Sequence, residues 1–283
     1  MAIALALASA ALFGAMSVAL RFALRSGVAA EVGALLTALP ALAVVFVYAL
    51  AHGLHDVAAA WPFALAGLVA PGGSQILFTL AVRHAGPSRT SVLVGSAPLF
   101  SVAIALTLLD EPLVPALIVG AVLIVAGGTM LVGERVRPET FRLIGYAFAL
   151  VATVLFAARD NLLRWLAVDT DVPASLAAVA TLGSGTLLVA AFVAARAASN
   201  RVLLAGTGPF GLAGLCFGLS YVALFEAYYR GRVTIVSPLI ATESLFGVLF
   251  SALVIRRAEL IGKGLLAGAL LIVAGGALIG AFR

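Results

Sequence analysis

Long apolar segments alternate with short polar breaks along the 283 residues of the chain. The breaks contain proline, glycine and charged residues, as in HGLHDV, DEPLVP, GERVRPET and VDTDVP. A segment of about 20 apolar residues is long enough to cross the hydrocarbon core of a bilayer as a helix. The pattern predicts ten such spans, at about residues 2–23, 30–51, 61–82, 88–108, 113–133, 142–164, 173–195, 203–229, 233–255 and 261–282.

The predicted spans should be helices, because backbone groups in lipid must find their hydrogen-bond partners within their own segment. The composition agrees, since 64% of the residues are hydrophobic and 10% are charged. Soluble domains carry about 25% charged residues. We therefore predict an all-α integral membrane protein that contacts the lipid bilayer.

The apolar phrase LIVAGG occurs twice, at residues 123–128 and 271–276, an offset of 148 residues. Further identities at this offset are Glu111/Glu259, Leu117/Leu265, Gly120/Gly268 and Ala121/Ala269. Five predicted spans separate the copies, and because five is odd, the two halves should cross the membrane in opposite directions. Inverted repeats of this kind are common in secondary transporters. We predict two inverted five-helix repeats, residues 1–138 and 139–283, around a central cavity.

A weaker pair of segments, residues 7–24 and 150–167, supports the same duplication at an offset of 143 residues. The identities are Leu12/Leu155, Phe13/Phe156, Ala15/Ala158, Leu20/Leu163 and Arg21/Arg164. The similarity predicts that residues 2–23 form the first membrane helix rather than a removed signal peptide, which would normally begin with a basic region.

The glycines beside LIVAGG suggest a packing role. Gly120 and Gly127 are seven residues apart, as are Gly268 and Gly275, so each pair lies on one helix face. Small residues on such a face let two membrane helices approach closely. We predict that LIVAGG is a packing surface rather than a substrate contact.

Residues 95–128 and 242–276 each contain an apolar span, an acidic residue and a Gly-rich span, and the first copy also carries Pro98. In this arrangement the ten-span chain resembles the drug/metabolite transporter superfamily, and within it the EamA branch. Two departures are Phe246, which replaces the proline in the second copy, and an N-terminus without the usual basic residues.

The resemblance implies a helical bundle whose central cavity is lined by spans 1, 3, 4, 6, 8 and 9. It also implies alternating access, with export as the expected direction, of small organic metabolites that are amino-acid-like or drug-like. The bacterial inner membrane is the expected location.

Glu243 is the leading candidate for a substrate-binding or coupling residue. It lies about ten residues into its predicted span, which places it roughly 15 Å deep, near the midplane. An ionisable residue at that depth is costly unless it is paired or neutral, and it is therefore a candidate for function. No basic residue lies one turn away, so Glu243 must be protonated, pair with another helix or face water. The alternative is a structural role, as a protonated side chain bonded to a neighbouring helix.

Six further polar residues are weaker candidates for substrate binding or coupling: Ser74, Gln75, Arg159, Asp160, Tyr221 and Glu226. Glu226 can instead pair with Arg230 one turn on, and Asp160 with Arg164. Arg159 can extend to the interface, or meet Glu243 or a substrate carboxylate.

Ser74 and Gln75 can serve either as cavity residues or as hydrogen bonds between helices. Tyr221 lies deeper in its span than Tyr228 and Tyr229, which are expected in the interfacial belt.

Pro71, Pro98 and Pro238 fall inside predicted spans 3, 4 and 9. Each proline removes a helical hydrogen bond and favours a kink. The kinks are candidate hinges, and static bends are the alternative.

Enzyme signatures are absent from the sequence. It contains no Gly-x-Ser-x-Gly, His-Glu-x-x-His or Walker A motif. His52, His55 and His84 lie at span ends without metal-ligand spacing. We expect no catalytic centre, no metal and no cofactor, so the driving energy must come from a gradient, with protons as the candidate coupling ion, or from a partner subunit. A structural or regulatory membrane subunit and an intramembrane enzyme are the alternatives.

The single cysteine, Cys216, can form no internal disulfide. The formal net charge of +5 comes mainly from loop arginines. In a membrane protein this charge reflects topology, and no nucleic-acid partner is expected. The sequence does not predict an oligomeric state.

The positive charges predict an orientation. Loops after odd-numbered spans, with the span ends, hold Arg21, Arg25, Arg83, Arg89, Arg135, Arg137, Arg142, Arg196, Arg201, Arg256, Arg257 and Lys263. The opposite side holds Arg164, Arg230, Arg232 and Arg283. The positive-inside rule then predicts both termini outside the cytoplasm, whereas the family usually has them inside, and the orientation stays open.

Overall fold

The structure is a computed structural model, and it describes residues 1–52, 56–108, 115–132, 141–168, 170–196, 200–231, 236, 239–255 and 262–282. This part of the chain is helical and contains no strand. Its elements are α1 (Ala2–Ala23), η1 (Leu24–Ser26), α2 (Ala30–His52), η2 (Val57–Ala60), α3 (Trp61–Gly67), η3 (Leu68–Gly73), α4 (Ser74–Ala85), α5 (Pro87–Val94), α6 (Ala97–Leu108), α7 (Pro115–Val132), α8 (Ile144–Val168), α9 (Ala174–Ala195), α10 (Asn200–Arg230), α12 (Glu243–Val254) and α13 (Lys263–Phe282).

Among the described residues, six helical regions are long and apolar enough to cross a membrane. They are Ala2–Ser26, Ala30–His52, Val57–Ala85, Ile144–Ala167, Ala174–Ala195 and Gly208–Arg230. Shorter apolar helices cover Pro115–Leu131, Leu239–Val254 and Lys263–Ile279. The predicted all-helical membrane architecture is confirmed, whereas the arrangement as ten inverted spans stays a prediction.

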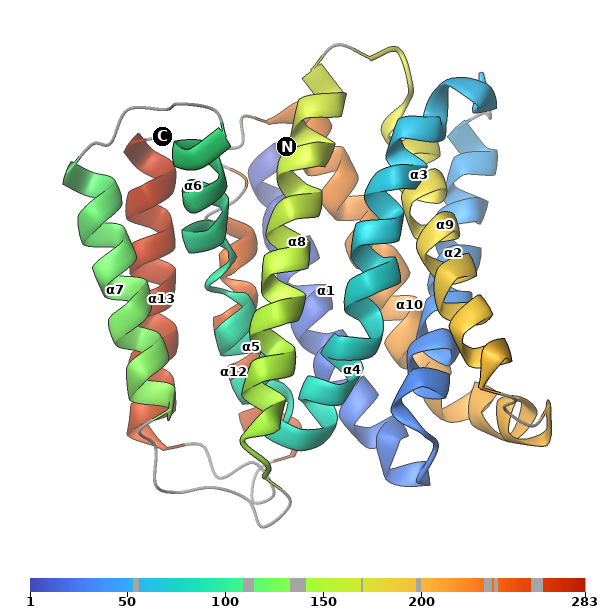
Figure 1. The fold of residues 1–283 in the computed structure, drawn as a ribbon, viewed down its shortest axis with the longest axis horizontal. Coiled ribbons are helices and arrows are strands. Elements are labelled where there is room, and N and C mark those ends of the chain that lie inside the picture. The colour runs from blue at the N-terminus through green and yellow to red at the C-terminus, as the bar shows by residue number, and fades with distance from the viewer. Residues whose placement is uncertain are drawn as a thin grey trace.

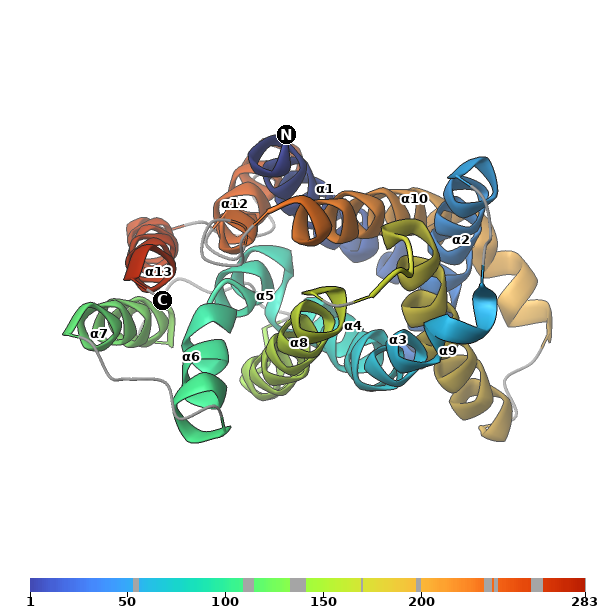
Figure 2. The same cartoon turned by 90° about the horizontal axis from the view of Figure 1, so that it is seen from above.

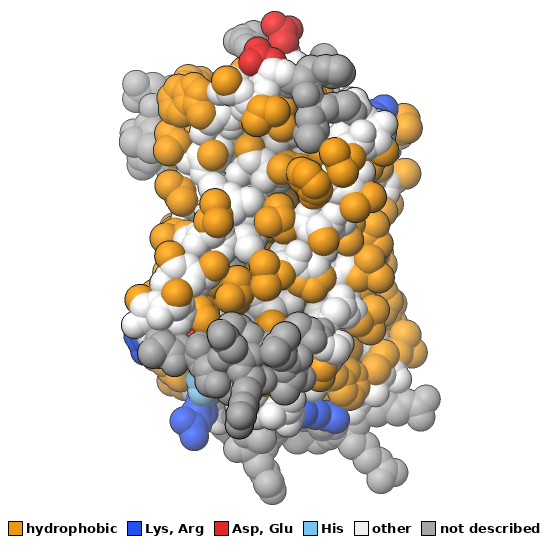
Figure 3. Space-filling view, turned by 90° about the vertical axis from the view of Figure 1, so that its right-hand side faces the viewer, with side chains coloured by type: hydrophobic (Ala, Val, Ile, Leu, Met, Phe, Trp, Pro, Cys, Tyr) orange, Lys and Arg blue, Asp and Glu red, His pale blue; other side chains and the backbone are white. Residues whose placement is uncertain are grey.

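The helices stand side by side, with α7 and α13 at one flank and α2 and α9 at the other (Figure 1). Seen from above, α12, α1 and α10 form one row and α6, α8, α4 and α3 a second, with α5 between the rows (Figure 2). On the face drawn in Figure 3, hydrophobic side chains cover the middle, blue basic side chains gather mostly at one end and red acidic ones at the other. An apolar band between charged ends is what a bilayer requires of a helical bundle.

Two of the predicted kinks are breaks in the helices. Ala70 has extended φ/ψ angles of −148° and 124° inside η3, directly before a cis peptide bond to Pro71. A second break separates Val94 at the end of α5 from Ala97 at the start of α6, and Pro98 lies just after it. Pro238 lies outside the described residues. The kinks at Pro71 and Pro98 are confirmed, and their role as hinges stays a prediction.

The Gly-rich helices α7 and α13 pack directly against each other. A Cβ atom on Gly120 would lie 2.8 Å from the Gly275 carbonyl oxygen, and one on Gly127 would lie 2.6 Å from that of Gly268. The earlier glycine of one helix meets the later glycine of the other, so the helices are antiparallel. The prediction that this surface serves packing is confirmed.

We predict that Gly127→Leu destabilises the fold by about 1–3 kcal/mol, because the added side chain must push two backbones apart. The matched control is Gly128→Leu, since a Cβ atom at Gly128 meets nothing within 4 Å. Thermal unfolding in detergent measures both variants. Equal stability of the two would contradict close packing between α7 and α13.

Candidate functional site

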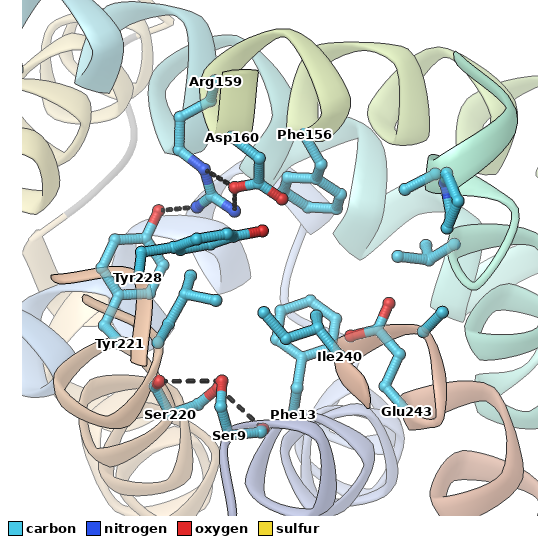
Figure 4. A pocket seen from close by; sticks show the side chains of 15 residues that line it. Ser9, Phe13, Phe156, Arg159, Asp160, Ser220, Tyr221, Tyr228, Ile240 and Glu243 are labelled. Carbon is cyan, nitrogen blue, oxygen red and sulfur yellow. Dashed lines mark hydrogen bonds and ion pairs between the residues drawn. The ribbon is translucent and has the colours of Figure 1, made fainter. Parts of the chain in front are cut away.

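A central pocket lies between α1, α8, α10, α12 and the break that joins α5 to α6 (Figure 4). Its lining encloses about 600 Å³ of space not filled by atoms, part of which is open to solvent. The residues that line it are Ser9, Phe13, Val94, Ala97, Pro98, Phe156, Arg159, Asp160, Ser220, Tyr221, Leu224, Tyr228, Ile240, Ala241 and Glu243. Spans 1, 4, 6, 8 and 9 of the sequence prediction contribute to this lining, whereas span 3 does not.

Arg159 on α8 forms the polar wall of the central pocket and is only 5% exposed. Its Nε and Nη2 atoms lie 2.8 and 2.7 Å from Oδ1 of Asp160. Its Nη1 donates a hydrogen bond of 2.5 Å to the hydroxyl of Tyr221 on α10. The guanidinium also lies over the rings of Tyr221 and Phe156, 5.2 and 5.6 Å from their centroids. An arginine at this depth is therefore neutralised and hydrogen-bonded, as a buried cation requires.

Two of the three roles considered for Arg159 from the sequence are not seen, whereas contact with a substrate carboxylate in the pocket that it lines stays a prediction. The arginine remains inside the bundle rather than extending to the interface, and its ion pair is with Asp160 rather than Glu243. The side chain of Arg164, the other partner considered for Asp160, lies outside the described residues.

Glu243 begins α12 and is 5% exposed. Its side chain points into the central pocket, on the wall opposite Arg159 and Asp160 (Figure 4). No residue in the described part of the chain forms a hydrogen bond or ion pair with this carboxylate. One wall therefore carries the neutralised pair of Arg159 and Asp160. The opposite wall carries the carboxylate of Glu243, for which the described residues provide no cation.

Ser9 and Ser220 connect α1 to α10 at a third wall. Each hydroxyl donates to the other residue's carbonyl oxygen at 3.0 Å, and the two hydroxyls lie 3.1 Å apart. Neither serine was predicted, because a hydroxyl in an apolar helix commonly bonds its own backbone and gives no signal. Phe13 was also missed, although its identity with Phe156 across the repeat could have indicated it.

Tyr228 corrects one expectation. The sequence placed it in the interfacial belt, but it is 2% exposed and lines the central pocket. Its position on the same face of α10 as Tyr221 and Leu224 follows from helical spacing.

Three predicted candidates lie outside the lining of the central pocket. Glu226 accepts hydrogen bonds of 2.7 Å from both Tyr48 and Arg230, so it has the pairing considered as the alternative. Ser74 and Gln75 are 0% and 1% exposed and lie at the start of α4. The described residues include no group of three His, Cys, Asp or Glu side chains that could hold a metal ion.

We predict that Tyr221→Phe lowers the stability of the protein by about 1.5–3 kcal/mol, because it removes a hydrogen bond to a buried charge. Tyr229→Phe is the matched control, since the buried Tyr229 hydroxyl has no hydrogen-bond partner in the described part of the chain. Thermal unfolding in detergent compares them. A larger loss for the control would contradict the role of the Tyr221 hydroxyl.

The comparison with known proteins agrees with the geometry of the central pocket. Residues 1–133 match the model of the EamA-like transporter family. No curated protein matches the chain significantly. One solved crystal structure, described only as that of a protein, is similar with a TM-score of 0.69 and 22% identity, over 98% of this chain and 95% of that chain; this likeness shows a shared fold. The resemblance inferred from the sequence is confirmed: over residues 1–133, the chain carries an EamA-like domain of the drug/metabolite transporter superfamily.

Proposed function

We propose that the chain is a secondary transporter that moves small organic metabolites by alternating access, with the central pocket as its substrate site. The match of residues 1–133 to the EamA-like transporter family supports an integral multi-pass membrane protein and favours a transporter over an enzyme. The observation that carries the finer proposal is Glu243, a carboxylate that faces the central pocket and has no hydrogen-bond or ion-pair partner in the described part of the chain. Such a group favours a transporter over a structural subunit, because a buried carboxylate without a hydrogen bond or ion pair among the described residues is costly unless it serves a function.

The contacts between helices support two inverted five-span repeats. If each of the first five spans is exchanged with its counterpart in the second half, the most extensive helix–helix contacts become other contacts of the structure. The packing of α1 on α10 becomes that of α8 on α4, and the packing of α2 on α10 becomes that of α9 on α3 and η3. The pairs α2–α9, α5–α12 and α7–α13 become themselves. A two-fold axis in the membrane plane has this property.

The lining of the central pocket suits a small molecule that combines polar and apolar parts. Tyr221 and Tyr228 offer hydroxyls, and Phe13 and Phe156 offer rings. Glu243 can hold the ammonium group of an amine, or carry a proton during the cycle. Amino-acid-like and drug-like molecules fit these features, and export from a bacterial cytoplasm is the direction that we propose.

The first test of the proposed function is substrate flux. Purified protein in liposomes should transport at least one member of a panel of radiolabelled amino acids and organic amines, faster than Glu243→Ala protein does. A parent protein that moves no member of the panel, with or without a pH gradient, would count against the proposed function.

We predict that Pro98→Ala slows transport while leaving the fold intact, because the break between α5 and α6 borders the central pocket and is suited to bending. The measurement is flux in proteoliposomes, with thermal unfolding as the check on the fold. Unchanged flux would assign the proline to static packing.

We predict that Glu243→Gln abolishes the accumulation driven by a pH gradient, because an amide keeps the shape of the side chain but cannot carry a proton. Substrate binding and exchange should survive if Glu243 carries protons, and binding itself should be lost if Glu243 holds an amine. Glu226→Gln is the control, since Glu226 is paired with Arg230 outside the central pocket. A Glu243→Gln protein that responds to pH like the parent would make Glu243 structural.

A further inference from the structure

Ser74 and Gln75 are two buried polar residues whose hydrogen bonding is incomplete. Oγ of Ser74 and Nε2 of Gln75 have no hydrogen-bond partner in the described part of the chain. Both residues follow the break at Ala70 and Pro71 directly. A buried donor without a partner is costly, so these two residues are candidates for binding a group of the substrate.

A cluster of three rings, Phe13, Phe78 and Phe156, connects these residues to the central pocket. The ring centroids lie 5.1 Å apart for Phe13 and Phe78, 6.0 Å for Phe13 and Phe156, and 6.1 Å for Phe78 and Phe156, all edge to face. Phe13 and Phe156 line the central pocket, whereas Phe78 is fully buried. Ser74 and Gln75 precede Phe78 by four and three residues, so they share its face of α4.

Buried hydroxyls continue beyond this phenylalanine cluster, on the side away from the central pocket. Ser9 precedes Phe13 by four residues and lines the pocket, while Ser17 follows it by four. The Ser17 hydroxyl lies 3.4 Å from that of Ser91 on α5, and both residues are 0% exposed. A pair of buried hydroxyls thus lies one helical turn beyond Phe13.

The repeat explains why Ser74 lacks a partner. Ser74 and Ala81 match Ser220 and Ala227 at one offset, since 220 − 74 and 227 − 81 both give 146. Ser220 bonds to Ser9 on α1. The counterpart of Ser9 on α8, at the offset of 143 residues, is Ala152, which has no hydroxyl.

The same holds for Gln75, whose counterpart at this offset is Tyr221. Tyr221 lines the central pocket and accepts a hydrogen bond from Arg159. The counterpart of Arg159 on α1 is Met16, which offers no hydrogen-bonding group comparable to a guanidinium. Gln75 therefore corresponds to a site residue, yet its own half of the chain supplies no partner.

We propose that Ser74 and Gln75 form a second substrate subsite, which lines the cavity when the protein opens to the opposite face of the membrane. The phenylalanine cluster closes this subsite in the present conformation. Nε2 of Gln75 is a neutral donor, so the subsite binds an acceptor oxygen of the substrate, such as that of a carbonyl, carboxylate or hydroxyl group. The inference rests on the proposed transport by alternating access.

Cysteine labelling tests the position of the subsite without any knowledge of the substrate. In a Cys216→Ala background, which removes the only cysteine, Ser74→Cys and Ser220→Cys are exposed to a membrane-impermeant maleimide from each face separately. We expect Ser220→Cys to react from one face and Ser74→Cys from the other. Gln75→Cys repeats the test should Ser74→Cys fold poorly. Thr181→Cys is the unreactive control, because Thr181 is fully buried and bonds to the Phe63 carbonyl oxygen.

The outcomes separate this inference from the proposed function. Two outcomes overturn the second subsite but leave the transporter in place. In the first, Ser220→Cys reacts but Ser74→Cys and Gln75→Cys react from neither face. In the second, Ser74→Cys and Gln75→Cys react from the same face as Ser220→Cys. A Ser220→Cys protein that reacts from neither face would remove the central pocket from the path, and with it the proposed function.

Flux tests the chemistry of the subsite, with whichever member of the panel the parent protein transports. We expect Gln75→Leu to slow flux about tenfold, as the loss of one buried hydrogen bond would, and Gln75→Asn to retain part of the rate. Equilibrium binding of the substrate to the central pocket should be unchanged in both variants. Parent-like flux in Gln75→Leu would overturn the role of the amide.

Discussion

Hydrocarbon offers no hydrogen bonds, so each polar side chain within this bundle must find its partner in the protein. Several hydroxyls solve this locally by donating to the carbonyl oxygen four residues earlier, as those of Ser17, Thr37, Thr79, Thr90 and Thr186 do. Arg159 needs more, and takes Asp160 and Tyr221. Glu243, which lines the central pocket, has no such partner in the described part of the chain, and neither do Ser74 and Gln75 beside the phenylalanine cluster. The proposed substrate site is inferred from these exceptions to the constraint.

Small residues position the pocket walls by letting helices approach. A Cβ atom on Gly95 would lie 2.8 Å from that of Ser244, and one on Gly247 would lie 2.2 Å from the hydroxyl oxygen of Ser91. This crossing of α5 and α12 brings Glu243 and Pro98 to the same pocket. The close approach of the two backbones thus fixes where these residues stand in the pocket wall.

The sequence predicted the all-helical membrane architecture, because apolar length is a strong local signal. It also drew attention to Glu243, Arg159, Asp160 and Tyr221, which lie in the lining of the central pocket, since an ionisable or phenolic group at depth stands out from an apolar background. It could not show which of these groups bind one another. That depends on which faces of α8, α10 and α12 meet, and helical periodicity within one span does not contain this information.

The residues that the sequence missed or misplaced have a common physical reason. Ser9 and Ser220 resemble ordinary helix serines until α1 and α10 are placed side by side. Tyr228 was expected at the interface because it lies near the end of its span, but α10 extends to Arg230 and is packed closely enough to bury the ring. Burial of a side chain near a helix end is set by its neighbours, and only the fold reveals them.

In the proposed repeat, the two halves differ in the chemistry of their pocket residues, and this difference bears on how the site would work. The charged residues that line the pocket, Arg159, Asp160 and Glu243, all come from the second half. Their counterparts in the first half are Met16, Ser17 and Gly95, which carry no charge. When the two repeats exchange conformations, a charged group of the substrate would therefore stay with the same residues near the midplane. Neutral residues such as Ser220 and Gln75 would contact the rest of the substrate, one in each conformation. Such an arrangement avoids moving an unpaired charge through hydrocarbon, which is the step that costs a membrane transporter most.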